Sequence, residues 1–355
     1  MGKKIKVLVV DDSALVRKIF SDIITEAPTL DLVGIAQNGV IALRKIEEFR
    51  PDIVTLDVEM PKLDGFGVLK EMIAKGLQSR VIMVSGVTKE GAESTLKALE
   101  MGALDFIAKP SGRMSDLKIL SDLLLAKIHA IAHIDMTQIT RAIHKPYETS
   151  ENKKLKSGGS GGVPERIIAI GTSTGGPQAL KDVFHDEALP EDSAYLVVQH
   201  MPAEFTSPFS ERLNQISKLT VKEAEQDEKI VSGWVYVAPG HSHLEIIYRQ
   251  RQPYVKLSQT GKVSGHQPSI DVLFMSVAKH CGKDAVAVIM TGMGRDGSKG
   301  IKAIKEMGGY TIAQDKESSI VFGMNREAIS LGAIKDVVPL KEIPSAIQSI
   351  LYSKR

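Results

Sequence analysis

Three side chains that can carry nucleophilic catalysis, Ser173, His200 and Asp296, each follow an apolar run in the second half of this chain. A serine hydroxyl is inert at neutral pH and needs a base within hydrogen-bond reach. A histidine base in turn needs a carboxylate to hold its tautomer and to stabilise the imidazolium. Because the carboxyl ends of parallel strands meet at one edge of a sheet, residues far apart in sequence can converge there. The three residues are therefore candidates for a serine hydrolase triad.

The stretch around Ser173 is compatible with two kinds of site. The Ile-rich run 167–170 predicts a buried strand, and Pro177 fits the first turn of a following helix. The segment Gly171-Thr-Ser-Thr-Gly175 matches the G-x-S-x-G spacing of serine hydrolases, with the hydroxyl facing a helix N-terminus that favours developing negative charge. A strand, a glycine-rich turn and a helix also hold phosphate in many α/β domains, so this stretch alone leaves both alternatives open.

The other two triad candidates also have structural alternatives. A single histidine after a strand is often only a satisfied structural residue, and an aspartate before glycine often only forms a turn. Around Asp296, however, Gly292, Gly294 and Gly297 predict a backbone loop along the same cleft. The N–H groups of this loop, with that of Thr174, can form an oxyanion hole.

Several further residues in this half have reactive side chains. His241 and His243 raise the alternative of a zinc site, but a third ligand at metal spacing is missing. His266, which precedes Gln267-Pro268, is expected to line the cleft or to cap the next helix. Cys281 is expected to pack at a helix end rather than to act as a nucleophile.

In the first half, acidic residues, a hydroxyl and a lysine stand at successive predicted strand ends: Asp11, Asp12, Asp57, Ser85 and Lys109. Carboxylates gathered at one edge repel one another unless a cation neutralises them, and hard oxygen ligands suit Mg²⁺. A lysine and a hydroxyl beside them fit an aspartyl phosphate, whose oxygens accept hydrogen bonds. The alternative, that Asp11 and Asp12 only cap the first helix, leaves the other three residues unexplained.

Alternating strands and helices position both groups of residues. In the first half, buried strands are predicted over 5–10, 32–36, 52–57, 80–85 and 105–108, with a closing helix over 117–132. In the second half, strands are predicted over 167–170, 195–200, 285–290 and 310–313, and an antiparallel insert over 234–239, 244–248 and 254–257. We therefore predict an α/β protein. Its N-terminal domain is a flavodoxin-like five-stranded parallel sheet, and its C-terminal domain is doubly wound and mainly parallel with an antiparallel hairpin insert.

A polar segment rich in glycine and serine separates the two patterns and predicts a flexible linker over 134–163. The predicted domains are then residues 1–133 and residues 164–355. A chain of 355 residues also exceeds a comfortable single core.

Composition narrows the class of protein. Hydrophobic content of 43% and charged content of 25% are ordinary for a soluble globular protein. No run of eighteen apolar residues predicts a membrane span, and no secretory leader opens the chain. Cys281 is the single cysteine, which excludes an intrachain disulfide and favours the cytoplasm. A net charge of +2 gives no argument for nucleic acid binding.

The motifs of the first half resemble the receiver domain of two-component response regulators. These are Val10-Asp-Asp-Ser13, Leu56-Asp-Val-Glu-Met-Pro61, Asp64-Gly65, Ser85-Gly86 and Lys109-Pro110. The resemblance implies that Asp57 accepts a phosphoryl group and that Ser85 and Lys109 contact it. It also implies that Asp12, Asp57 and the Glu59 carbonyl hold Mg²⁺, with Asp11 contributing through water. Phe106 matches an aromatic switch position but lacks the hydroxyl of the commoner tyrosine.

The motifs of the second half closely resemble the chemotaxis protein-glutamate methylesterase family. They are Gly171-Thr-Ser-Thr-Gly-Gly176, Gln199-His-Met-Pro202, Ala238-Pro-Gly240, Pro268-Ser-Ile-Asp-Val-Leu-Phe274, Thr291-Gly-Met-Gly-Arg-Asp-Gly297 and Val321-Phe-Gly-Met324. The resemblance implies Ser173 as nucleophile, His200 as base and Asp296 as orienting acid. It further implies that the N–H groups of Thr174 and Met293 form the oxyanion hole.

The resemblance implies a phosphorylation-activated enzyme that hydrolyses glutamyl methyl esters, and deamidates specific glutamines, on chemoreceptors. Its implied partners are the cytoplasmic helices of methyl-accepting chemoreceptors and a chemotaxis histidine kinase as phosphodonor. No nucleic acid, no membrane insertion, a monomeric state and no cofactor in the catalytic domain are expected. Before phosphorylation, the receiver is expected to pack over the catalytic cleft.

Two other classes of protein share some of these features. A DNA-binding response regulator would need a short helix-turn-helix output with a basic recognition helix. An α/β-hydrolase of small esters would use His266 or His280 as base, but its triad order is Ser, Asp, His, whereas the order here is Ser, His, Asp.

Overall fold

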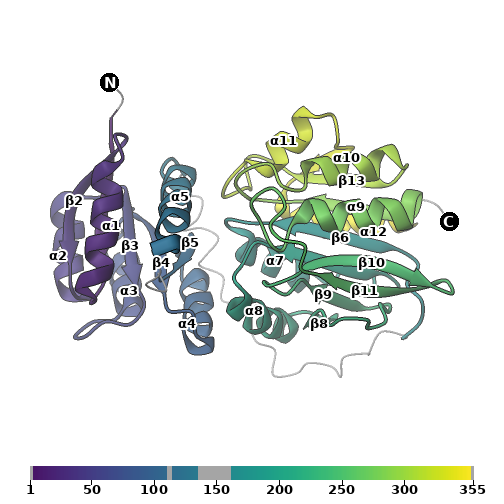
Figure 1. Cartoon of the computed structure of the whole chain (residues 1–355), viewed down its shortest axis with the longest axis horizontal. Helices are drawn as coiled ribbons and strands as arrows, with labels where there is room; N and C mark the ends of the chain where they lie inside the picture. The colour runs from purple at the N-terminus through teal and green to yellow at the C-terminus, as the bar shows by residue number, and fades with distance from the viewer. Residues whose placement is uncertain (1–2, 110–113, 135–160, 353–355) are drawn as a thin grey trace. The chain divides into compact units, whose positions relative to one another are not determined.

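The computed structural model describes residues 3–109, 114–134 and 161–352, which form two compact α/β units, Met1–Pro146 and Tyr147–Arg355 (Figure 1). Most of the predicted linker, residues 135–160, lies outside the described residues. Among the residues described, no helix is both long and apolar enough to cross a bilayer.

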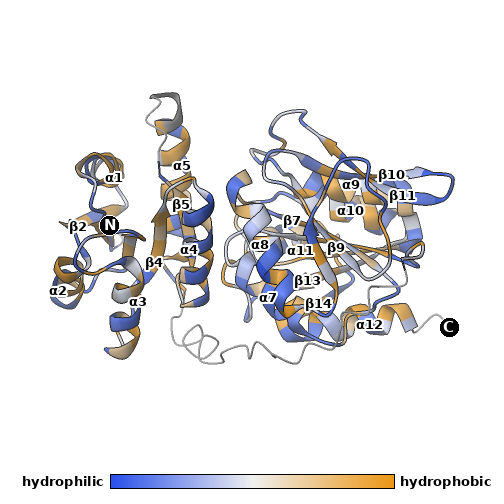
Figure 2. Cartoon of the chain, turned by 90° about the horizontal axis from the view of Figure 1, so that it is seen from below, coloured by the Kyte–Doolittle hydropathy of each residue, from blue (hydrophilic) through white to orange (hydrophobic). Residues whose placement is uncertain are grey.

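The first unit alternates strand and helix throughout. Its elements are β1 (Ile5–Val10), α1 (Ala14–Glu26), β2 (Leu30–Ala36), α2 (Gly39–Phe49), β3 (Ile53–Asp57), α3 (Gly65–Ala74), β4 (Arg80–Ser85), α4 (Lys89–Glu100), β5 (Asp105–Ala108) and α5 (Met114–Ile131). The strands form a parallel five-stranded sheet in the order β2-β1-β3-β4-β5. Helices α1 and α5 cover one face and α2, α3 and α4 the other (Figures 1 and 2). The predicted flavodoxin-like fold is confirmed.

The second unit is built on a larger sheet. Its elements are β6 (Ile167–Thr172), α7 (Gly176–His185), β7 (Ala194–Gln199), α8 (Ala203–Ile216), β8 (Thr220–Glu223), β9 (Trp234–Val237), β10 (His243–Arg249), β11 (Gln252–Ser258), α9 (Ile270–Cys281), η1 (Gly282–Asp284), β12 (Ala285–Ile289), α10 (Ser298–Glu306), β13 (Tyr310–Gln314), α11 (Met324–Ser330), β14 (Asp336–Val338), η2 (Leu340–Glu342) and α12 (Ile343–Tyr352). Seven strands pair in parallel in the order β14-β13-β12-β6-β7-β9-β8. Strands β6, β7 and β12, which precede the triad candidates, are therefore neighbours at the centre of the sheet.

One element of the predicted antiparallel insert is placed differently in the structure. Strands β10 and β11 form the expected two-stranded antiparallel hairpin. The segment predicted over 234–239 instead forms β9, which pairs in parallel with β7 and β8 in the main sheet. Residues 234–237 form a short run of large side chains, three of them buried, and such a run does not show whether its neighbouring strands are parallel or antiparallel.

One face of the large sheet packs against the hairpin, α9 and α10. Apolar side chains of β6, β7 and β12 meet those of α9, such as Leu273 and Phe274, and those of the hairpin, such as Leu244 and Ile246, in a single buried cluster. This core fixes the N-terminal end of α9 near the carboxyl ends of the central strands (Figure 1). Those strand ends carry the candidate site.

Candidate functional site

The turn that carries Ser173 joins β6 to α7. Gly175 adopts φ +77°, a backbone conformation that side chains disfavour, and a Cβ there would lie 2.5 Å from the Ile320 side chain. Pro177 lies in the first turn of α7, as predicted. The Ser173 N–H donates to the Thr291 carbonyl at 3.0 Å. The Thr291 hydroxyl returns a hydrogen bond to the Thr174 carbonyl at 2.9 Å. The serine turn is thus tied to the loop that follows β12.

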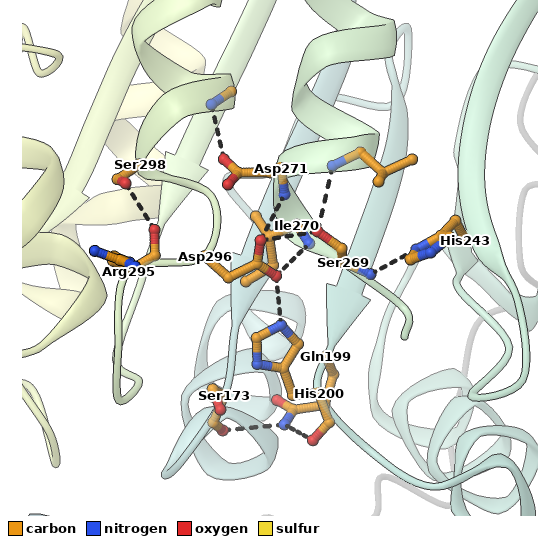
Figure 3. Close-up of polar contacts among 12 residues, drawn as sticks. Ser173, Gln199, His200, His243, Ser269, Ile270, Asp271, Arg295, Asp296 and Ser298 are labelled. Carbon is orange, nitrogen blue, oxygen red and sulfur yellow. Dashed lines mark hydrogen bonds and ion pairs between the residues drawn. The ribbon is translucent and has the colours of Figure 1, made fainter. Parts of the chain in front are cut away.

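His200 and Asp296 meet at this edge of the sheet. His200 Nε2 lies 2.8 Å from Asp296 Oδ2, and both side chains are almost wholly buried. The second ring nitrogen, Nδ1, is buried and has no hydrogen-bond partner. Figure 3 shows Nδ1 on the side of the ring that faces Ser173. The structure therefore pairs His200, directly after β7, with Asp296 in the loop after β12, and Ser173, directly after β6, lies on the other side of the ring without a hydrogen bond to it.

This arrangement determines which ring nitrogen is available. A carboxylate accepts hydrogen bonds, so Asp296 favours the tautomer in which Nε2 of His200 carries the proton. The Nδ1 atom then presents a lone pair, which is what a base needs in order to take the proton of a nearby hydroxyl. Neutral His200 can therefore act as a base toward the side on which Ser173 lies.

Asp296 accepts more than the histidine bond. Oδ2 also accepts the Ile270 N–H at 2.8 Å, while Oδ1 accepts the Ser269 hydroxyl at 2.8 Å and the Asp271 N–H at 3.1 Å. Burial is the largest influence and acts to raise the pKa of Asp296. The bond and charge of His200, with the donors from Ile270 and Ser269, outweigh it, so this pKa lies below its usual value. Asp296 is held as an anion.

Asp296 and Asp271 cap each other's helices. Asp296 accepts N–H groups from the first turn of α9, and Asp271, in that turn, accepts the Gly300 N–H of α10 at 2.8 Å. Helix α10 needs this cap because its own N-cap residue, Gly297, has no side chain to supply one. Helix α9 therefore holds this loop at two points: at Asp296 itself, and at the start of α10, which follows the loop.

Gln199 is a site residue that the sequence analysis did not single out. Its buried side-chain amide donates to the Ser173 carbonyl and to the His200 carbonyl, both at 3.0 Å. It thereby joins the backbones of two triad candidates. Its position at the end of a buried strand, directly before His200, was the available signal, because a buried amide must find partners.

The histidines weighed as alternatives lie in different environments. His266 stacks on His200, with ring centroids 3.8 Å apart and ring planes 6° apart. His280 stacks instead on Tyr248, and burial lowers its pKa. His243 is buried, with Nδ1 accepting the Ser269 N–H at 3.0 Å and Nε2 lying 2.7 Å from the Gly261 carbonyl. Both of its ring nitrogens are engaged, which argues against His243 as a zinc ligand.

The two residues assigned to the oxyanion hole flank the same turn and loop. Thr174 is buried beside Ser173, and Met293 is half-buried in the loop after β12. Gly292, before Met293, approaches Ser173 closely, since a Cβ added there would lie 2.8 Å from the Ser173 Cβ. The oxyanion role of these two N–H groups stays a prediction.

The acidic cluster of the first unit lies at the carboxyl ends of β1 and β3. Asp11, Asp12 and Asp57 each offer an oxygen within 4.8 Å of the others. Lys109 Nζ lies 2.7 Å from Asp57 Oδ2 and 3.3 Å from the buried Asp11 Oδ2, so it forms ion pairs with both carboxylates. Capping does not account for this cluster, because Ser13 caps α1. Three carboxylates that share one lysine are a donor set that fits a divalent cation.

Burial and mutual repulsion raise the proton affinity of this cluster. Burial is the largest cause that raises the pKa of Asp57 to about 6, and the Asp11 charge adds to it, whereas Lys109 acts in the opposite direction. Burial likewise raises the pKa of Asp11. In both carboxyl groups, burial outweighs the Lys109 charge in setting the direction of the pKa shift.

Three further residues named from the sequence lie in the same unit. Ser85 is buried and its hydroxyl donates to the Gly91 carbonyl at 3.0 Å. The Glu59 N–H donates a long hydrogen bond to Asp57 Oδ1 at 3.4 Å. Phe106 is buried, with the Lys127 ammonium 5.7 Å from its ring centroid. The phosphate, metal and switch roles of these residues stay predictions.

The chain matches two known families and several full-length relatives. Residues 168–347 match the CheB methylesterase family and residues 7–120 the response regulator receiver domain. A protein-glutamate methylesterase/protein-glutamine glutaminase of Pyrococcus horikoshii is 45% identical over 351 residues, covering 98% of this chain and 94% of the relative. A second, from Pseudomonas aeruginosa, is 42% identical over 345 residues, covering 97% of this chain and 96% of the relative.

A solved structure also matches the second unit. The crystal structure of the Thermotoga maritima CheB methylesterase catalytic domain covers 52% of this chain and 98% of its own, with a TM-score of 0.50 and 38% identity. The resemblance inferred from the sequence motifs is thereby confirmed. The chain belongs to the CheB methylesterase family and carries a response regulator receiver domain ahead of its methylesterase region.

Proposed function

We propose that this chain is a phosphorylation-activated protein-glutamate methylesterase that also deamidates specific glutamines on chemoreceptors. The observation that carries the proposal is the buried His200–Asp296 pair, whose unpartnered Nδ1 faces Ser173. The names of its full-length relatives support the same activity. A DNA-binding output is disfavoured, because the second unit is built on a seven-stranded α/β sheet.

In the proposed reaction, Ser173 Oγ attacks the carbonyl carbon of a glutamyl methyl ester while His200 Nδ1 takes the hydroxyl proton. Asp296 stabilises the imidazolium, and the N–H groups of Thr174 and Met293 bind the developing oxyanion. As the intermediate collapses, His200 returns the proton to the leaving methoxide and methanol departs. Water, deprotonated by His200, then hydrolyses the acyl-enzyme to free glutamate. With a glutamine side chain, ammonia takes the place of methanol.

The receiver unit would regulate this reaction through Asp57. A histidine kinase of the chemotaxis system would donate the phosphoryl group to its carboxylate, and Lys109 and Ser85 would contact the phosphate oxygens. Asp11, Asp12, Asp57 and the Glu59 carbonyl would hold Mg²⁺, which neutralises phosphate charge when bound. We propose that phosphorylation relieves inhibition of the catalytic unit by the unphosphorylated receiver, and that the enzyme works as a cytoplasmic monomer.

Methanol release from a methylated chemoreceptor fragment tests the proposal. The full-length chain should release methanol, and a small-molecule phosphodonor should increase the rate. Ser173→Ala should abolish release, whereas Ser207→Ala, which removes a hydroxyl from α8, should not. Asp57→Ala should keep a basal rate that no longer responds to the phosphodonor. Wild-type rates from Ser173→Ala would overturn the assignment of the nucleophile, and activation of Asp57→Ala would overturn the proposed control.

A further inference from the structure

We propose that His266 is a positioning residue for the base, and that its ring holds His200 in the plane from which Nδ1 faces Ser173. The inference rests on the proposed function, because it concerns the same reaction. It goes beyond the triad in assigning a role to a second imidazole, which a serine-type mechanism does not require for proton transfer.

The contact between the two rings is face to face. Their planes differ by 6° and their centroids lie 3.8 Å apart, which is van der Waals contact between the two ring faces. The hydrogen bond to Asp296 holds His200 only through the edge of the ring, at Nε2. The hydrogen bond at Nε2 and the covalent bond at Cγ still permit the ring plane to rotate, and a flat neighbour against its face opposes this rotation.

The loop that carries His266 is built to hold its position. Val263 and His266 exchange backbone hydrogen bonds of 3.0 and 2.9 Å across a two-residue turn. The turn residues, Ser264 and Gly265, have φ of 53° and 85°, as a type I′ hairpin turn requires. A tight hairpin of this kind fixes the direction in which its last residue projects.

Anchors outside the turn tie the loop to the rest of the catalytic unit. The Gln267 side-chain amide donates to the His241 carbonyl at 2.9 Å. His243 bonds to Gly261 on one side of the turn and to the Ser269 N–H on the other. Ser269 in turn donates to Asp296. Asp296, at the edge of the His200 ring, and the loop of His266, at its face, are therefore connected through Ser269.

The stack also acts on charge. When His200 takes the serine proton it becomes a cation, and the face of a neutral His266 ring would attract it. Since this attraction exists only once the proton has moved, it favours the transition state over bound substrate and affects kcat rather than KM. A ring without nitrogen would supply the same face, so the role does not require proton transfer by His266.

Three substitutions of His266 in the full-length chain separate the ring face from its chemistry. His266→Ala removes the face, His266→Phe keeps a flat face without nitrogen, and His266→Leu fills much of the volume without a flat face. We expect kcat for methanol release to fall about tenfold in the Ala and Leu variants, with KM unchanged. The Phe variant should retain kcat within about threefold of wild type. His241→Ala, which removes an exposed neighbouring imidazole, is the matched control and should behave as wild type.

Circular dichroism and thermal unfolding establish whether each variant is folded. If the Ala variant is unfolded, the comparison of the Phe and Leu variants is sufficient for the test. Wild-type kcat in the Leu variant overturns the inference. Equal losses in the Phe and Leu variants also overturn it, because they indicate a role for the imidazole nitrogens. A change in KM alone would assign His266 to substrate binding instead. Activity remaining in Ser173→Ala would refute the proposed function itself, whereas an inactive Ser173→Ala beside an unaffected His266→Leu refutes only this inference.

Discussion

Replacing the carboxylate of Asp296 by an amide should inactivate the enzyme while leaving it folded. Each Asp296 oxygen accepts two hydrogen bonds, Oδ2 from His200 and Ile270 and Oδ1 from Ser269 and Asp271. Asparagine has one oxygen, so its NH₂ group must face one of these pairs of donors. Either orientation leaves a backbone N–H of the first turn of α9 without an acceptor, and both remove the negative charge.

The two orientations have different consequences for His200. If the NH₂ group faces Nε2, the ring must accept there and carry its proton on Nδ1, so the lone pair that faces Ser173 is lost. If the oxygen faces Nε2, the tautomer is kept but the imidazolium has no anion to stabilise it. The loss of the correct tautomer costs about 10⁴ in kcat in a related triad, and we expect a loss of about 10³ to 10⁴ here. The unpaired N–H should lower the free energy of unfolding by about 1–3 kcal/mol.

Methanol release and urea unfolding of Asp296→Asn measure the two effects. Asp315→Asn is the matched control, because Asp315 also accepts hydrogen bonds, from Ser318, but takes no part in the triad. The control should keep kcat, and it should also keep its stability, because both Ser318 bonds go to one Asp315 oxygen, which asparagine retains. A kcat of Asp296→Asn within tenfold of wild type would show that His200 does not depend on this carboxylate, and the tautomer argument would then be wrong.

The same variant makes a prediction about pH. The folded pKa of Asp296 lies below its ordinary value of 3.8, so its ionised form stabilises the fold at pH values above 3.8. This contribution is lost as pH falls through the folded pKa. The stability difference between wild type and Asp296→Asn should therefore be full near neutral pH and shrink below about pH 4, as urea unfolding at several pH values would show. A difference that stays constant down to pH 3 would contradict a depressed pKa.

Three further predictions concern other parts of the chain. Mg²⁺ should raise the unfolding temperature of the receiver unit in wild type and by less in Asp12→Ala, in calorimetry with and without the ion; an equal rise in both would remove Asp12 from the metal site. Gly292→Ala should reduce kcat for methanol release, because its Cβ would lie 2.8 Å from the Ser173 Cβ and displace the nucleophile. Unchanged methanol release would show that the turn can move aside. Asp271→Ala should lower the free energy of unfolding by about 1–2 kcal/mol through loss of the α10 cap, and an unchanged urea midpoint would contradict that role.

The fold class could be predicted because the buried strands and the amphipathic helices both have clear hydrophobic patterns in this sequence. Strands of four to six apolar residues alternate with amphipathic helices, and such runs specify parallel sheets with buried strands. The exception was β9, a short and almost wholly buried run that pairs in parallel between β7 and β8 and not in the hairpin. Strand β8, Thr220–Glu223, was missed because four residues with mixed burial carry almost no periodic signal.

The site could be predicted in part for a related reason. Parallel strands bring their carboxyl ends to one edge, so Ser173, His200 and Asp296 could be expected to meet once their strands were recognised. The sequence could not show that Asp296 also accepts hydrogen bonds from the backbone N–H groups of the first turn of α9, or that the His266 ring stacks on His200. Those contacts depend on the packing of α9 and on the path of a hairpin turn, neither of which follows from a local pattern.

The mutual capping of α9 and α10 has a consequence for the motions of the catalytic unit. The first turn of α9 donates to Asp296, in the loop before α10, and the first turn of α10 donates to Asp271, in α9. Neither N-terminus can therefore fray without releasing its neighbour, and their amide protons should exchange with solvent in a single concerted opening. Because Asp296 is one of the two carboxylates, an opening that exposes these amides also disassembles the triad. The lifetime of the active arrangement is then set by the interlocked helix starts rather than by the flexibility of any one loop.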